Sequence, residues 1–179
     1  DITARRNLWE ILKRQLEQKI IDNKFLPFNV STIGIDQKSL LIDCELNDIK
    51  RTVSLTITDP SGQERYKAIT RAFYRDIEGV ILVYDLTVKT TFDSLEKWIS
   101  EIKEFTNKAE NEYMLFLLGT KSDLLEDQKS SFEDDIDKFC KKYNIDNLGE
   151  CSCKNFSDED FKSKLLNGII QKLYKKIGI

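Results

Sequence analysis

Residues 79–84 read Gly-Val-Ile-Leu-Val-Tyr and form a continuous apolar run between polar segments. A run of this length without polar alternation is typical of a strand that is buried on both faces of a parallel sheet. Residues 114–118, which read Met-Leu-Phe-Leu-Leu, form a second such run. The two runs therefore predict two buried strands of a mostly parallel sheet.

Periodic patterns around these runs extend the prediction to the rest of the fold. Apolar residues recur at helical spacing over residues 92–105 and 131–143, and again near the C-terminal end. Residues 38–46 and 51–58 read as strands separated by an Asn-Asp turn signal, which predicts a hairpin. Strands that alternate with helices after this hairpin indicate an α/β fold with a mostly parallel sheet, helices on both faces and right-handed crossovers.

The composition is that of one globular domain. The chain has 179 residues, 40% hydrophobic and 33% charged, which is sufficient for a single domain with a full core. We read residues 1–179 as one domain, because no repeat or low-complexity stretch divides them. A net charge of −3 gives no basic field that would favour nucleic acid. No apolar run approaches the ~20 residues of a membrane span.

Two residue types narrow the possible chemistry. The chain has no histidine, which excludes a Ser-His-Asp triad and argues against a zinc site. Its four cysteines lack zinc-ligand spacing and indicate a reduced, cytosolic chain. Two of them, Cys151 and Cys153, are expected to be buried thiols on opposite faces of a strand.

Four polar segments lie at the ends of the expected strands in a fixed order, where ligands of α/β folds bind. They are Ser-Thr-Ile-Gly-Ile-Asp at 31–36, Asp-Pro-Ser-Gly-Gln-Glu at 59–64, Gly-Thr-Lys-Ser-Asp at 119–123 and Glu-Cys-Ser-Cys-Lys at 150–154. Together these segments resemble the small GTPases, and within them the Rab family most closely. The resemblance extends over roughly residues 25–177.

The resemblance implies roles for four residues near the phosphates. Thr32 matches the switch I threonine that meets magnesium and the terminal phosphate, and Asp59 matches the carboxylate that holds magnesium through water. Gly62 matches a glycine whose N–H donates to the terminal phosphate, and Gln63 matches the residue that orients the attacking water.

The resemblance also implies a guanine-base site. Asp123 would accept two hydrogen bonds from guanine, and Lys121 would cover the base with its stem. The segment Ser152-Cys153-Lys154 matches a loop whose backbone N–H meets the guanine oxygen. Thr120 replaces the asparagine whose amide braces this base loop against the phosphate loop in the family.

The phosphate loop of the family has no counterpart in the sequence. The first glycine of the chain is Gly34, so no G-x-x-x-x-G-K-[S/T] segment precedes Thr32. Counted back from Thr32 without gaps, residues 12–14 read Leu-Lys-Arg at the Gly-Lys-[S/T] position, which leaves Lys13 as a weak phosphate candidate.

The segment around Lys13 has the pattern of a helix. Apolar residues recur every four positions over residues 5–24, so we expect an atypical helix within residues 1–24. A helix bonds its N–H groups internally, and they cannot converge on a phosphate. We therefore expect weak or absent nucleotide binding and inactive or very weak GTP hydrolysis, with Gln63 vestigial.

The resemblance also leaves one strand position open. The family has a central strand directly before the phosphate loop, and residues 1–6 are too polar to form it. Neighbouring strands could close up, a partner could donate a strand, or the chain could be incomplete at its start. The sequence leaves all three possibilities open.

The residues and the resemblance lead to two functional hypotheses. The first is a Rab-like protein-binding or scaffold subunit with a degenerate nucleotide site and no cofactor, which binds protein partners through its switch-like surface and N-terminal helix. Gln37 and Thr58 stand at usually aromatic effector positions, and the C-terminal end has no prenylatable cysteine, so no direct membrane anchor is expected. The alternative is a working switch in vesicle and membrane traffic that binds GTP or GDP with magnesium.

Overall fold

We analysed a computed structural model of the chain. The structure describes residues 35–60, 71–72, 74–75, 77–110, 112–125, 132–155 and 158–177. The predictions for Lys13, Thr32, Gly62, Gln63 and the helix within residues 1–24 lie outside these ranges. The element that occupies the central strand position therefore stays a matter of prediction.

The predicted hairpin is confirmed and is longer than expected. Strands β1 (Ile35–Leu46) and β2 (Ile49–Pro60) pair antiparallel from Leu46 opposite Ile49 to Ile35 opposite Pro60. The two turn residues have positive φ angles of 50° and 62°, as a tight hairpin turn requires, and asparagine and aspartate tolerate this conformation. The ladder extends beyond the predicted segments by residues 35–37 of β1 and by residues 49–50 and 59–60 of β2.

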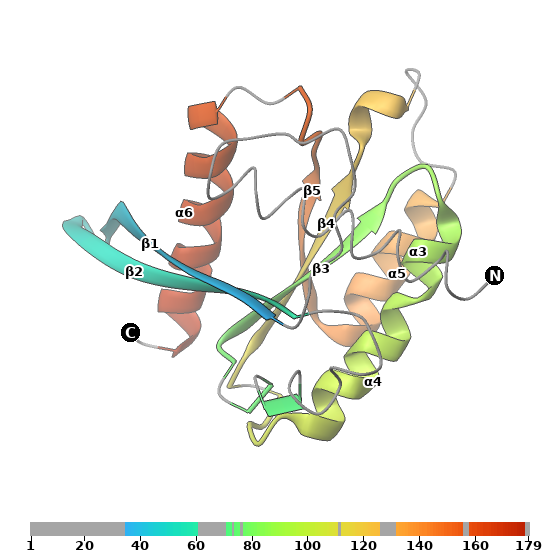
Figure 1. The fold of residues 1–179 in the computed structure, drawn as a ribbon, viewed down its shortest axis with the longest axis horizontal. Helices are drawn as coiled ribbons and strands as arrows, with labels where there is room; N and C mark the ends of the chain where they lie inside the picture. The colour runs from blue at the N-terminus through green and yellow to red at the C-terminus, as the bar shows by residue number, and fades with distance from the viewer. Residues whose placement is uncertain are drawn as a thin grey trace.

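The two apolar runs form neighbouring strands of a parallel sheet, as predicted. Strands β3 (Gly79–Asp85), β4 (Met114–Thr120) and β5 (Ile145–Glu150) lie in the order β3-β4-β5. Figure 1 shows the three strands side by side. The side chains in the middle of β3 and β4 are almost completely buried. The sequence analysis expected a strand near residues 150–154 but did not mark the range of β5, because Ile145-Asp-Asn-Leu-Gly-Glu contains neither an apolar run nor a clear alternation.

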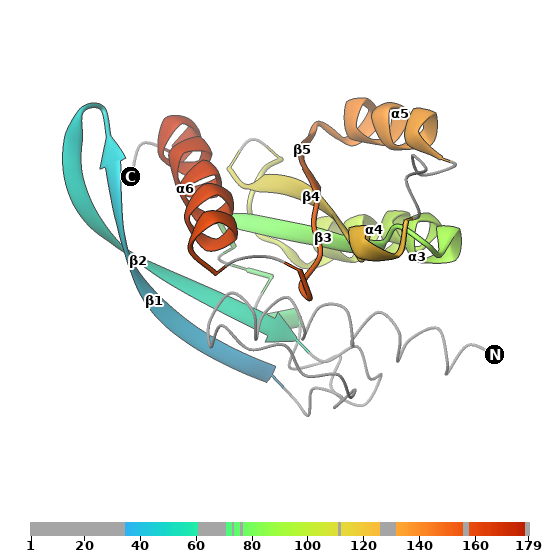
Figure 2. The ribbon, with the colours of Figure 1, turned by 90° about the horizontal axis from the view of Figure 1, so that it is seen from above.

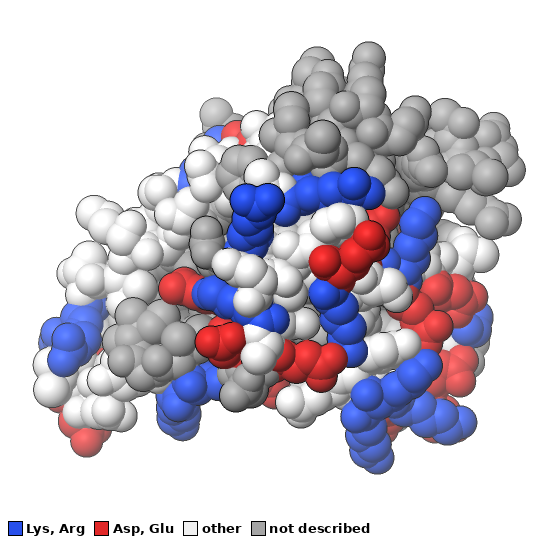
Figure 3. All heavy atoms as spheres, turned by 90° about the horizontal axis from the view of Figure 1, so that it is seen from below, with Lys and Arg blue, Asp and Glu red and all other residues white. Residues whose placement is uncertain are grey.

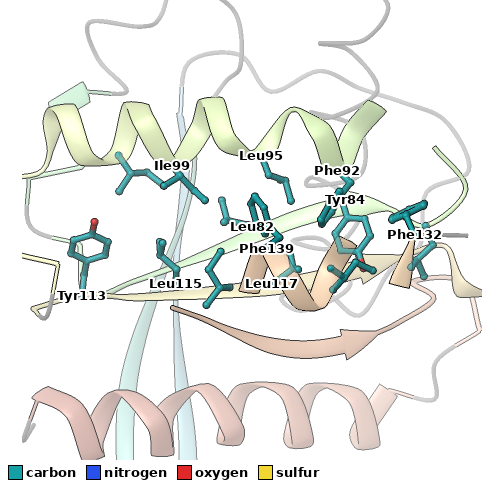
Figure 4. Close-up of a cluster of buried hydrophobic side chains, with 14 of the residues drawn as sticks. Leu82, Tyr84, Phe92, Leu95, Ile99, Tyr113, Leu115, Leu117, Phe132 and Phe139 are labelled. Atoms are coloured by element: carbon teal, nitrogen blue, oxygen red, sulfur yellow. The ribbon is translucent and has the colours of Figure 1, made fainter. Parts of the chain in front are cut away.

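Helices cover both faces of the parallel sheet, as predicted. Helices α3 (Lys89–Asp93), α4 (Leu95–Phe105) and α5 (Glu133–Tyr143) pack on the face that carries Leu82, Tyr84, Leu115 and Leu117 (Figure 4). Helix α6 (Asp158–Ile177) packs on the opposite face against Val83, Phe116 and Leu118.

The helix expected over residues 92–105 is divided in two. Helix α3 ends at Asp93 and α4 begins at Leu95, with Ser94 between them. The Ser94 hydroxyl donates to the Thr91 carbonyl oxygen at 2.7 Å, so the side chain takes an acceptor that a continuous helix would use. The helical spacing of the sequence does not reveal this local competition.

Helix α6 contacts both the parallel sheet and the inner face of the hairpin. Within the described ranges, the hairpin and the parallel strands form two separate sheets. Ile170 of α6 lies in one apolar cluster with Cys44 and Leu46 of β1, and Leu40 and Ile42 pack on the same side of the hairpin. Figure 2 shows the hairpin alongside α6. Apolar packing on α6 therefore couples the hairpin to the rest of the fold.

The surface carries a mixture of charges. Figure 3 shows one face of the molecule, on which basic and acidic side chains are interspersed, as expected for a net charge of −3. Among the described helices, none has the length and apolar character that a bilayer crossing requires.

Candidate functional site

The carboxyl ends of the three parallel strands bring the predicted base-site residues to one edge of the sheet. Backbone hydrogen bonds connect these ends across the strands. The Leu86 N–H donates to the Thr120 carbonyl at 3.1 Å, and the Cys151 N–H donates to the Gly119 carbonyl at 2.8 Å. The Ser122 N–H donates in turn to the Cys151 carbonyl at 3.1 Å. The two segments that the sequence assigned to base binding are thus directly joined.

Thr120 uses its hydroxyl within the sheet. The side chain is buried, and its Oγ1 donates to the Tyr84 carbonyl oxygen on β3 at 2.8 Å. A hydroxyl carries a single hydrogen, so this bond takes up its only donor. The threonine thus connects β4 to β3, whereas the family resemblance implied an asparagine that braces the base loop against a phosphate loop.

Lys121 turns its side chain back onto a buried carboxylate. Its backbone is left-handed, with φ 64° and ψ 35°, an uncommon conformation for a residue other than glycine. The ammonium Nζ lies 2.9 Å from Asp85 Oδ2. The lysine stem is therefore positioned by its charged end, and it connects the base loop to the end of β3.

Asp85 is a site residue to which the sequence analysis gave no role. Its side chain is 1% exposed, and its Oδ1 accepts hydrogen bonds from the Thr87 N–H at 2.9 Å and from Thr87 Oγ1 at 2.6 Å. Together with the Lys121 ammonium, these donors compensate the charge that burial would otherwise disfavour. The available signal was an acid placed directly after a fully apolar strand.

Asp123 lies in the short 3₁₀ turn η2 (Ser122–Leu124) that follows Lys121. The Leu124 N–H donates to the Lys121 carbonyl at 3.0 Å, and the Leu125 N–H donates to the Ser122 carbonyl at 3.2 Å. The Asp123 side chain is half-buried, and no ion pair within the described part of the chain engages its carboxylate. Its oxygens can therefore accept hydrogen bonds from a ligand.

Ser152 stabilises a turn in the second segment assigned to base binding, residues 150–154. Its buried Oγ accepts hydrogen bonds from the backbone N–H groups of Lys154 and Asn155, both at 3.2 Å. A serine hydroxyl that accepts from the residues two and three positions later stabilises a tight turn. This turn fixes the backbone of Cys153 beside the end of β4.

The cysteines of this segment are buried, as expected, but the prediction that they face opposite ways is wrong. Cys151 and Cys153 belong to one apolar cluster with α6, because side chains two residues apart in an extended segment point to the same side. The side-chain hydrogen bond that the Cys151 thiol makes with Cys153, together with burial, raises the pKa of Cys151, and the Asp123 charge adds to this effect.

Asp59 stands apart from the base segments, at the carboxyl end of β2. It is 2% exposed and lies opposite Asp36 in the hairpin register. A carboxylate oxygen is the kind of ligand that Mg²⁺ prefers, so Asp59 fits its implied role as far as its chemistry is concerned. Within the described ranges, however, no group of three acidic, cysteine or histidine side chains is arranged to hold a metal ion.

The outer face of the hairpin carries cross-strand polar pairs. Gln37 Nε2 donates to Thr58 Oγ1 at 3.2 Å, and the hydroxyls of Ser39 and Thr56 lie 3.1 Å apart. Gln37 and Thr58 are the two positions that the resemblance marks as usually aromatic. This face presents hydrogen-bonding groups where large rings would otherwise contact an effector.

Comparisons with known proteins agree with this arrangement. Residues 11–174 match the sequence model of the Ras family. Ras-related protein Rab-12 of Mus musculus is 35% identical over 162 residues, which cover 90% of this chain and 63% of that protein. Ras-related protein Rab-26 of Mus musculus is 37% identical over 116 residues, which cover 65% of this chain and 42% of that protein. Ras-related protein Rab-15 of Mus musculus is 31% identical over 160 residues, which cover 89% and 71% respectively. The chain thus spans less than two thirds of the length of Rab-12.

Proposed function

Since the chain belongs to the Ras family and is a Rab-like small GTPase by sequence, we propose that it acts as a protein-binding subunit with a degenerate nucleotide site. The observation that carries this proposal is that two side chains of the base loop (residues 119–123) make contacts within the protein. Lys121 Nζ is paired with the buried Asp85, and the Thr120 hydroxyl is bonded to β3. Each group thus has a partner within the protein, an ion pair for Lys121 and a hydrogen bond for Thr120, so these two contacts do not depend on a bound nucleotide.

The phosphate side of the site supports the same proposal from the sequence. The Gly-Lys-[S/T] position reads Leu-Lys-Arg at residues 12–14, and Arg14 replaces the hydroxyl that would ligate magnesium. A missing glycine-rich cradle removes three or four charge-assisted hydrogen bonds of ~1.5–3 kcal/mol each, a total of ~5–10 kcal/mol. At about 1.4 kcal/mol per tenfold change, nucleotide affinity falls by roughly 10⁴ or more. GTP turnover is then negligible, and no resident cofactor is expected.

Partner binding is assigned to the exposed part of the fold. The hairpin presents Gln37, Ser39, Thr56 and Thr58 as an outward polar row, which fits a partner that makes hydrogen bonds. In this proposal residues 1–179 form one small-GTPase-like domain, and the helix within residues 1–24 adds to the partner surface. The domain acts in the cytoplasm as part of a protein assembly.

Bound nucleotide in the purified protein provides the direct test. Protein isolated in magnesium-containing buffer is denatured, and the released nucleotides are separated and quantified by chromatography. We expect far less than one nucleotide per chain and no saturable binding of fluorescent GDP in the micromolar range. Stoichiometric GDP or GTP would refute the degenerate site.

A working GTP-binding switch in membrane traffic is the second candidate. It is favoured by the position of Asp123, which lies in the turn that the Ser122 N–H joins to the Cys151 carbonyl, next to the Ser152 segment. This candidate requires phosphate contacts from Lys13 or from outside the chain. Asp123→Ala should then abolish the preference for guanine over adenine, whereas Asp134→Ala, at the exposed first turn of α5, should leave it unchanged.

A further inference from the structure

The Asp85–Lys121 ion pair is the most deeply buried charge pair in the described part of the molecule. The Asp85 side chain is 1% exposed and the Lys121 side chain 28% exposed, whereas the pairs Lys89–Asp93, Lys89–Asp135, Lys103–Glu110, Lys142–Glu96 and Lys172–Asp146 join side chains that are at least 39% exposed. A carboxylate in this position requires a cation, since burial strongly disfavours an isolated charge. The lysine is therefore held much more firmly than a surface side chain.

Asp85 is itself fixed by its own segment. Its Oδ1 accepts two hydrogen bonds from Thr87, and its backbone N–H donates to Thr91 Oγ1 at 2.9 Å. Thr91 Oγ1 also donates to the Val88 carbonyl at 2.7 Å. The carboxylate thus has a set position at the end of β3, before any contact with the base loop is considered.

Lys121 connects the Asp85 carboxylate to the turn that follows it in the chain. Its left-handed backbone directs the side chain back to Asp85, while its carbonyl accepts the Leu124 N–H that closes the 3₁₀ turn. Asp123 lies inside that turn. A loss of the Lys121 side-chain contact removes the main interaction that compensates the unfavourable backbone conformation at the start of the turn.

We propose that Asp85 is the positioning residue of the base loop, and that its carboxylate holds Lys121 and the Asp123 turn in a guanine-reading arrangement without a bound nucleotide. This inference rests on the proposed function, because it explains how the base loop keeps its geometry in a protein whose nucleotide site is degenerate. Asp85 acts through Lys121 and is not itself expected to touch a ligand.

Amide hydrogen exchange in the nucleotide-free protein tests the proposal. The reporters are the N–H groups of Ser122, Leu124 and Leu125, whose bonds define the loop, and the core amides of β3 and β4 serve as the reference. Asp85→Asn and Lys121→Met should each accelerate exchange of the loop amides at least tenfold more than that of the core amides. Lys121→Arg, which keeps the charge, should exchange within about threefold of the wild type.

Two further variants complete the design. Lys172→Met removes the lysine of an exposed pair with Asp146, at 3.0 Å, and should leave loop exchange unchanged. The double variant Asp85→Asn with Lys121→Met should loosen the loop no more than the stronger single change, because both remove the same contact.

Three results would overturn the proposal: unchanged loop exchange, an equal acceleration of all amides, or full additivity of the two single effects. If Asp85→Asn does not fold, the comparison of Lys121→Met with Lys121→Arg decides, and equal loop exchange in these two variants overturns it. Copurified GDP would refute the proposed function alone. The exchange comparison is then made after phosphatase treatment removes the nucleotide. A failure of the degenerate-site proposal can therefore be distinguished from a failure of the positioning role of Asp85.

Discussion

Gly119→Ala is expected to destabilise the protein through a steric conflict at the end of β4. A Cβ at this position would lie 2.9 Å from Leu86 Cδ2 and 3.0 Å from both Leu86 Cγ and Tyr84 Oη. Both neighbours are 2% exposed, and the Tyr84 ring packs against Phe92 with centroids 5.3 Å apart, so neither side chain has room to move. Overpacking of this kind costs about 1–3 kcal/mol.

Gly168→Ala is the matched control, because the same methyl group meets nothing within 4 Å at that position of α6. Alanine is favoured over glycine inside a helix by about 0.5–1 kcal/mol, so this variant should be more stable than the wild type. Urea unfolding and thermal unfolding, both followed by circular dichroism, measure these changes. At about 2–4 °C per kcal/mol, the melting temperature of Gly119→Ala should fall by roughly 2–12 °C. Equal midpoints for Gly119→Ala and the wild type would refute the steric argument.

Three other perturbations follow from the described contacts. Burial, with a smaller contribution from Glu101, raises the pKa of Tyr74 to about 12. In the unfolded chain a tyrosine loses this proton near pH 10. The free energy of unfolding should therefore decline as the pH rises from 10 towards 12. Urea midpoints across this range should decline less in Tyr74→Phe. Thr120→Val should lower the free energy of unfolding by about 1–2 kcal/mol, because the buried Tyr84 carbonyl loses its hydroxyl donor. Thr120→Ser keeps the hydroxyl and should retain most of the wild-type stability. A double-mutant cycle on the exposed Glu96–Lys142 pair should give a coupling that disappears in 1 M salt, and a coupling that persists would contradict surface screening.

Patterns that extend over several residues predicted the fold well. The apolar runs of β3 and β4 were identified because burial on both faces leaves no place for polar side chains. The range of β5 was not predicted, because this strand alternates poorly; within the described residues it pairs with β4, and its conformation depends on that neighbour. The break at Ser94 coincides with one side-chain hydrogen bond, which periodicity does not detect.

The candidate site was predictable in its order but not in its contacts. Motif order placed Lys121, Asp123 and Ser152 at strand ends, and the structure locates them there. The pairing of Lys121 with Asp85 depends on a left-handed backbone at a lysine, and no sequence pattern marks a lysine for that conformation. Contacts of this kind arise from the three-dimensional arrangement and have no local signature.

The register of the hairpin has a consequence for how this part of the chain can change in length. Leu40 and Ile42 face α6, while Asp43 and Glu45 face outward, and the two sets alternate residue by residue. An insertion of one residue in β1 would turn the two carboxylates towards the apolar helix, whereas an insertion of two would restore the original facing. We therefore expect a one-residue insertion after Leu41 to be much more harmful than a two-residue insertion at the same point. Length variation in this hairpin is accordingly limited to even steps.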